Sequence, residues 1–198
     1  MSNVEIQKDF FISTNQQKVL SFLAKFSDQE YHEREIARKV GISYGSANRV
    51  LNDLAVQGLL MRRRVGKMFF YSFNRSDPIF KPFKTFISIA LLRPLIDKLR
   101  SVASEVVLYG SCARGEDASK SDVDLFIISE DKEEALRLIR NYKFLKGFEQ
   151  LKIEPVIFSP AELPKSEKGG REFLSLVREG IVLWDKTKDE AGIKAIVR

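Results

Sequence analysis

The sequence predicts an α+β protein whose N-terminal part is mainly helical and whose C-terminal part carries a small mixed sheet flanked by helices. Apolar residues recur at helical spacing from Gln16 to Gln57, and two short runs at 59–73 then read as a hairpin. Two further apolar runs, Val106–Tyr109 and Leu125–Ile128, are typical of strands that are covered on both faces. At 198 residues, the chain is long enough for two small domains.

Composition narrows the function classes. No apolar run approaches the roughly 18 residues that a membrane span needs, so we expect no membrane partner. The N-terminus lacks the features of a signal peptide, and the one cysteine, Cys112, cannot form an internal disulfide, so we expect a cytoplasmic protein. The net charge of +6 is uneven, because residues 1–75 hold 12 Lys/Arg and 7 Asp/Glu. This asymmetry favours a polyanionic partner for the N-terminal part.

The first elements follow from spacing. In 16–26, the residues Val19, Leu20, Leu23 and Phe26 share one helical face. Further helices are expected at 32–40 and 43–57, separated by a tight turn at Gly41, which is a helix-turn-helix spacing. The strands 59–64 and 67–73 surround Val65-Gly66 and complete a basic hairpin.

Three helices and a basic hairpin resemble the winged helix-turn-helix domain of transcription regulators, and we assign residues 1–75 to such a domain. In that family the third helix enters the major groove and the wing follows the DNA backbone. The resemblance implies DNA contacts from the third helix and from the wing, made by Ser43, Tyr44, Ser46, Asn48, Arg49, Arg62, Arg63, Arg64 and Lys67. Two alternatives stay open: the wing arginines could form a solvated strand edge, and such domains also serve in dimerisation.

Residues 76–103 form the predicted helical connector. Asp77-Pro78 begins it, and Pro94 is expected to kink or restart the helix. Its stripe of Phe, Ile and Leu should pack on a domain or on a second copy of the chain. We therefore expect a fixed domain arrangement, with a homodimer as one form of it.

The segment 106–128 carries the candidate chemistry. Gly110 lets the backbone approach a ligand closely, and Ser111 opens a predicted short helix, so an anion fits at this turn. Asp122 and Asp124 flank Val123 at the start of a strand, and alternation places both carboxylates on one face. Paired carboxylates repel unless a cation lies between them, and their oxygens suit magnesium held together with substrate phosphates.

The chain continues with an amphipathic helix at 132–141, a strand-like run that contains Glu154, and a loop with Pro160, Pro164 and Gly169-Gly170. A helix at 171–179 and a last apolar run at 181–184 close the domain.

The residues Gly110, Ser111, Arg114, Gly115, Ser121, Asp122 and Asp124 resemble the signature of the DNA polymerase beta-like nucleotidyltransferase superfamily. The likeness is greatest to its minimal bacterial and archaeal members, and we assign residues 104–198 to such a domain. Members carry a third carboxylate, usually Asp, on a later strand; here Glu154 stands in its place and Pro155 follows it. Pro155 is unusual away from a sheet edge.

The resemblance implies two-metal nucleotidyl transfer from an NTP, expected to be ATP. Asp122, Asp124 and Glu154 would hold two Mg²⁺ ions, and Glu154 would favour deprotonation of an acceptor hydroxyl. Gly110, Ser111, Arg114 and Lys120 would bind the nucleotide, although Arg114 and Lys120 could equally be solvated loop residues.

Two functions from different classes remain. The first is an enzyme that transfers a nucleoside monophosphate to a protein or small-molecule acceptor, with the winged helix locating it on DNA or holding a partner. The second is a DNA-binding regulator whose transferase fold senses nucleotide or mediates assembly without catalysis. Minimal relatives often act beside a separately encoded protein partner; such a protein is one candidate partner here, and the sequence does not identify it.

Overall fold

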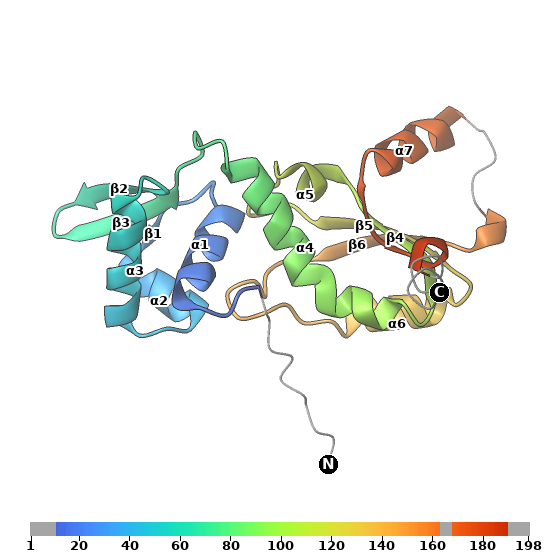
Figure 1. The fold of residues 1–198 in the computed structure, drawn as a ribbon, viewed down its shortest axis with the longest axis horizontal. Helices are drawn as coiled ribbons and strands as arrows, with labels where there is room; N and C mark the ends of the chain where they lie inside the picture. Colours follow the sequence, from blue (N-terminus) through green and yellow to red (C-terminus); the bar gives the residue numbers. More distant parts are fainter. Residues whose placement is uncertain (1–10, 163–167, 190–198) are drawn as a thin grey trace, which may run out of the picture.

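A computed structural model describes residues 11–162 and 168–189, and it has the mixed α+β architecture that the sequence predicts (Figure 1). Among the described residues, no helix combines the length and the apolar character needed to cross a membrane. The elements are, in chain order, α1 Asn15–Lys25, β1 Tyr31–His32, α2 Glu33–Val40, α3 Tyr44–Val56, β2 Leu60–Val65, β3 Met68–Phe73, α4 Phe80–Leu99, β4 Ala103–Leu108, α5 Gly110–Arg114, β5 Val123–Ser129, α6 Lys132–Arg140, β6 Ile153–Phe158, the 3-10 helix η1 Pro160–Glu162, α7 Lys168–Arg178 and β7 Ile181–Asp185.

The N-terminal half contains α1, α2 and α3 beside an antiparallel sheet of order β1-β3-β2. Local signals set the helix ends. Thr14 and Gln17 form a capping box at the start of α1, Gly41 ends α2 in the left-handed conformation, and the Ser43 side chain caps α3. The helices expected at 16–26, 32–40 and 43–57 are therefore confirmed to within one residue at each end.

The C-terminal half is built on a sheet of order β6-β5-β4-β7, in which β5 and β6 are parallel and the other pairs are antiparallel. Figure 1 shows α6 on one side of this sheet and α7 on the other. Because β6 is an edge strand, Pro155 takes a position where a missing backbone donor is tolerated. The difficulty that Pro155 raises in the sequence is thereby resolved.

Helix α4 joins the two halves and contributes to both cores. Ile87 and Leu91 belong to the N-terminal core, whereas Leu92 and Leu95 belong to the core beneath the β4–β5 sheet. The helix is continuous through Pro94, so the alternative in which this proline restarts the helix is wrong. Buried side chains on both sides of the proline hold the two segments in one helix.

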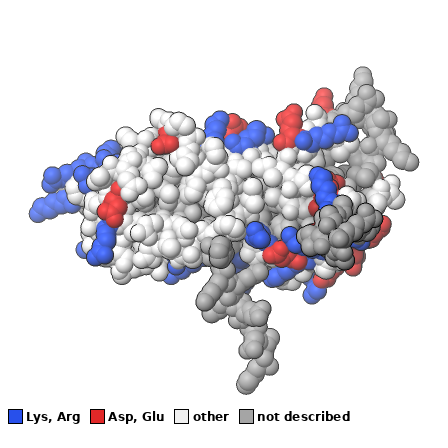
Figure 2. Space-filling view, viewed as in Figure 1, with Lys and Arg blue, Asp and Glu red and all other residues white. Residues whose placement is uncertain are grey.

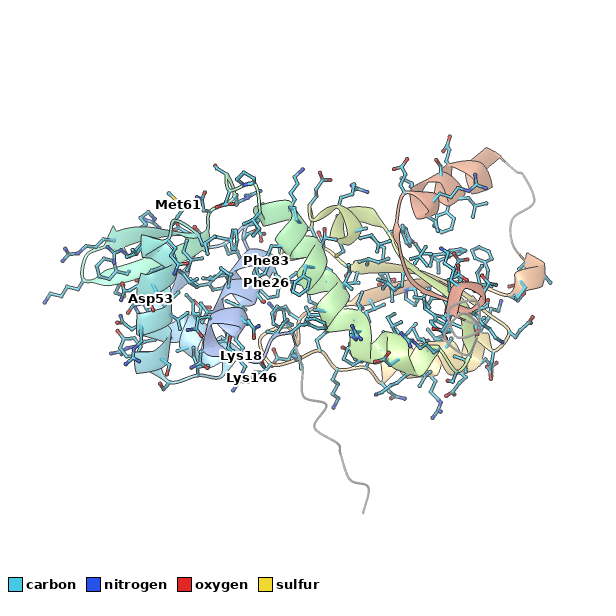
Figure 3. The ribbon with its side chains drawn as sticks, viewed as in Figure 1. Lys18, Phe26, Asp53, Met61, Phe83 and Lys146 are labelled. Atoms are coloured by element: carbon cyan, nitrogen blue, oxygen red, sulfur yellow. The ribbon has the colours of Figure 1, made fainter. Side chains whose placement is uncertain are left out.

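The connection between α6 and β6 also crosses between the halves. Phe148 and Leu151 from this connection are buried in the N-terminal core, and the ring of Phe148 lies 6.0 Å from that of Phe26. Phe26, labelled in Figure 3, lies where α1 meets α4. The two halves therefore share core contacts in addition to α4.

Candidate functional site

The first two carboxylates lie at the start of β5. Val123 is buried against the α4 and α6 side of the sheet, so alternation directs Asp122 and Asp124 to the opposite face. Phe126 lies on that same face and contacts Phe173 of α7, with ring centroids 6.0 Å apart. The aspartates thus share the face that α7 covers, as the strand pattern predicts.

The third carboxylate lies on the neighbouring strand. Asp124 and Glu154 are Cα partners in the parallel pair of β5 and β6, so their side chains leave the same face of the sheet. Burial raises the pKa of Asp124, and the negative charges of Asp122 and Glu154 raise it further, against an opposing effect of Arg114. The three acids therefore form one electrostatic group.

Gly110 packs directly against this group. Its φ is 70°, and a Cβ added there would lie less than 3.0 Å from Oδ2 of Asp124. The preceding residue, Tyr109, donates its backbone N–H to the carbonyl of Asp124 at 3.1 Å. Only glycine satisfies both the left-handed backbone and the close approach of the carboxylate. The turn at Gly110 and the start of β5 are therefore held in direct contact.

Ser111 follows in the first turn of α5. Within the described ranges 11–162 and 168–189, no residue hydrogen-bonds to its hydroxyl. The next residue, Cys112, is fully buried and its Sγ donates to the backbone carbonyl of Asp122 at 3.5 Å. Burial raises the pKa of the Cys112 thiol, so we assign it a packing role.

The two cations expected near the nucleotide are placed differently. Arg114 is exposed and its Nε donates to Glu116 at 3.0 Å, but it still lies near enough to oppose the raised pKa of Asp124. Lys120 is exposed on the loop before β5. The structure thus brings Arg114 into electrostatic contact with Asp124.

The carboxylates supply part of the ligand set that Mg²⁺ needs, and substrate phosphates and water would supply the rest. In the part of the chain that is described, no group of three or more His, Cys, Asp or Glu side chains is arranged to hold a metal ion. Mg²⁺ is usually held by one or two carboxylates together with substrate phosphates and water. The Asp122–Asp124 pair, whose mutual repulsion a cation would relieve, matches that requirement.

A second polar site lies between α3 and the hairpin. Glu33 of α2 is 5% exposed and accepts hydrogen bonds from the Tyr44 hydroxyl at 2.8 Å, the Asn48 amide at 3.3 Å and the Tyr71 hydroxyl at 3.2 Å. The hydrogen bond that Tyr44 donates to Glu33 raises the pKa of the Tyr44 hydroxyl. Tyr44 and Asn48, both expected to face DNA, are therefore oriented by a buried acid that spacing alone does not reveal.

The wing arginines divide between two faces of β2. Arg62 and Arg64 stack on the ring of Phe69, at 5.0 and 5.9 Å from its centroid. Arg63 faces the other way, stacks on Phe70 and pairs with Glu30. Figure 2 shows Lys and Arg side chains gathered at the tip of this hairpin. The basic surface exists, but the three arginines do not share it.

Three of the residues expected at DNA, Tyr44, Asn48 and Lys67, line a groove of about 440 Å³ formed by α2, α3 and the hairpin. Arg49 is exposed on α3. Ser43 and Ser46 are engaged with each other, because the Ser43 hydroxyl caps the Ser46 N–H and donates to its hydroxyl.

A larger groove, of about 770 Å³, runs along α6, the connection after it and β6, and Glu154 is among its lining residues. The sequence does not predict it, because the aromatic and basic side chains that line it come from a connection without periodicity. These residues include Tyr142, Lys143, Phe144 and Lys152.

Comparison with known proteins bears on the C-terminal half. Residues 91–174 match the family model described as "Nucleotidyltransferase domain". The matched segment contains the Gly110-Ser111 turn and all three carboxylates, and it supports assignment to the nucleotidyltransferase superfamily. It does not extend over the N-terminal helices and hairpin. The searches of curated proteins and of solved structures found no match.

Proposed function

We propose that the nucleotidyltransferase domain of this chain is a magnesium-dependent enzyme that moves a nucleoside monophosphate from an NTP, expected to be ATP, to an acceptor hydroxyl. The observation that carries the proposal is the alignment of Asp124 with Glu154 on one face of the sheet, with Gly110 packed against the Asp124 carboxylate. This geometry sets the Gly110-Ser111 turn beside an acidic cluster, in which burial raises the pKa of Asp124 and the charges of Asp122 and Glu154 raise it further.

Each residue has a role in this reaction. Asp122 and Asp124 would hold Mg²⁺, with Glu154 beside them for a second ion; the metal would neutralise triphosphate charge and favour deprotonation of the acceptor. The Ser111 hydroxyl and the backbone of the turn would bind the terminal phosphates, and Arg114 would offset their charge. The acceptor oxygen forms a bond to the α-phosphorus, the bond to the β-phosphate oxygen breaks, and pyrophosphate leaves. The acceptor proton passes to Glu154 or to water.

The N-terminal half is proposed to bind DNA as a winged helix-turn-helix domain. The supporting observation is the groove between α3 and the hairpin, lined by Lys67 and flanked by Arg62 and Arg64. Lys and Arg side chains bind phosphates independently of sequence, while α3 supplies side chains for base edges.

A non-catalytic regulator is the second candidate, favoured by one observation. Buried ion pairs join the N-terminal half and α4 to the loop before β5, so nucleotide binding could alter DNA affinity without any transfer. The two candidates differ in whether label moves from the nucleotide to an acceptor.

The experiment uses NTP labelled either at the α-phosphate or at the γ-phosphate, with magnesium and candidate protein and small-molecule acceptors. Nucleotidyl transfer predicts that only the α-label reaches the acceptor. Asp122→Asn should abolish this transfer, whereas Asp97→Asn, which neutralises an exposed acid of α4 paired with Arg100, should leave it unchanged. Equal transfer by wild type and Asp122→Asn would refute the assigned site.

A further inference from the structure

Three charged side chains from three segments meet in the interior between the two halves. Lys25 of α1 lies with its Nζ 2.8 Å from Oδ2 of Asp117, and Lys84 of α4 lies with its Nζ 3.5 Å from Oδ1. The three side chains are each 1% exposed. Lys84 also donates to the backbone carbonyl of Asp117, and Lys25 donates to Ser88 at 2.9 Å.

These ion pairs are strong constraints because all three side chains are buried. Desolvation lowers the pKa of Lys84, and the charge of Asp117 opposes that effect. A buried charge that loses its partner is strongly unfavourable, so the position in which Asp117 pairs with both lysines is favoured. Asp117 belongs to the loop between α5 and β5, and this loop ends at Asp122.

A second contact holds the same loop from the surface. Oδ1 of Asp28 accepts the backbone N–H of Ser119 at 3.0 Å, and Oδ2 accepts its hydroxyl at 2.7 Å. Gln29 donates to the same hydroxyl at 2.9 Å. Although burial alone would raise it, these hydrogen bonds hold the pKa of Asp28 below its usual value.

The start of the loop is fixed by α4. A Cβ at Gly115 would lie less than 3.0 Å from the backbone carbonyl of Lys81, and Gly115 itself has a φ of 66°. Residues 115, 117 and 119 are thus each held by the N-terminal half or by α4. Only Lys120 and Ser121 separate the last of these anchors from Asp122.

We propose that Lys25, Asp28 and Lys84 are positioning residues of the nucleotide site, through which the N-terminal half sets the location of Asp122. The inference rests on the proposed function and deepens it, because it makes the N-terminal half part of the scaffold for transfer. It assigns these residues no contact with nucleotide or acceptor. Their effect reaches the reacting groups only through the loop 115–122.

Asp28 gives the sharpest test, because it is exposed and its removal leaves no buried charge. Asp28→Ala should lower the rate of α-label transfer at saturating NTP by about tenfold or more, as small displacements of catalytic groups do. The melting temperature should fall by no more than about a few degrees, because the lost hydrogen bonds lie at the surface. Amide hydrogen exchange in 115–122 should become faster. Asp28→Asn retains one acceptor oxygen. Its transfer rate and its exchange rate in 115–122 should lie between those of wild type and Asp28→Ala.

Glu30→Ala is the matched control. It removes an exposed carboxylate two residues away, whose partner is Arg63 rather than the loop, and it should match wild type in transfer and in exchange of 115–122. Equal effects of the two alanine variants, or no effect of Asp28→Ala on either measurement, would overturn the proposal. If wild type transfers no label, the proposed function and catalytic positioning both fail. The exchange measurement then decides separately whether the N-terminal half holds the loop.

Discussion

Asp124 and Glu154 are aligned as Cα partners on two parallel strands, and the carboxylate of Asp124 occupies the space that a side chain at Gly110 would need. This relationship brings the turn at Gly110 into direct contact with an acidic cluster. A substitution at Gly110 should therefore displace the carboxylate of Asp124, and this can be tested.

The first prediction concerns Gly110. Gly110→Ala should place a Cβ against the Asp124 carboxylate, displace it, and lower nucleotide affinity and transfer by about tenfold or more. Gly58→Ala is the matched control, because Gly58 has a φ of 77° but nothing lies within 4 Å of an added Cβ. Both variants should lose about 1 kcal/mol of stability from backbone strain. A nucleotide affinity that is equal in the two variants would contradict the role of the close approach.

The second prediction concerns the pH dependence of stability in the absence of metal. Because the folded-state pKa of Asp124 is raised, its ionised form destabilises the fold, and this destabilisation fades as pH falls through the raised pKa toward the ordinary value of an aspartate. Asp124→Asn should therefore be at least as stable as wild type at neutral pH, with the difference shrinking on acidification. Denaturant unfolding at several pH values measures this. A variant that is markedly less stable at neutral pH would show that the carboxylate has a stabilising partner.

The sequence predicted much of this site because its signals are local. The alternation Asp122-Val123-Asp124 requires only the period of a strand, and the turn at Gly110 requires only a glycine before a helix. The division of the wing arginines follows from the same alternation, since Arg63 lies between Arg62 and Arg64, but the sequence-based assignment groups all three by charge.

Other features depend on contacts between distant segments. No pattern relates Lys25 to Asp117, because the two are brought together only by the packing of α1, α4 and the loop before β5. The edge position of β6, which explains why a proline is tolerated at 155, depends on the order of the strands in the sheet. Hydrophobic spacing does not predict that order. Glu33 likewise gathers donors from α3 and β3.

The third prediction concerns the wing. Replacing Arg62 and Arg64 together by Ala should weaken binding to duplex DNA, and the slope of log affinity against log salt should fall by about 0.9 for each side chain that neutralises a phosphate. Arg63→Ala should have a smaller effect, because Arg63 is already paired with Glu30 on the other face. Fluorescence anisotropy over a range of salt concentrations measures both. An Arg63→Ala variant that weakens binding as much as the double variant would show that this ion pair opens to reach DNA.

The fourth prediction concerns Glu33, which accepts three hydrogen bonds in a buried position. Glu33→Gln would turn an amide N–H₂ toward the donors of Tyr44, Asn48 or Tyr71, and should cost about 1–3 kcal/mol of stability. At temperatures where the variant is folded, sequence discrimination should weaken more than nonspecific affinity, because Tyr44 and Asn48 lose their orientation. Unchanged sequence discrimination would show that Tyr44 and Asn48 do not take part in base recognition.

The most direct measurement is single-turnover transfer of the α-label at saturating NTP and magnesium, compared between wild type and Glu154→Gln after nucleotide titration of both. We expect nucleotide affinities within a few-fold of each other, since the turn at Gly110 and the aspartate pair remain. We also expect a transfer rate lower by about 10² or more in the variant, since the acceptor loses the carboxylate that favours its deprotonation. Equal transfer rates would contradict the placement of Glu154 in the site and, with it, the proposed mechanism.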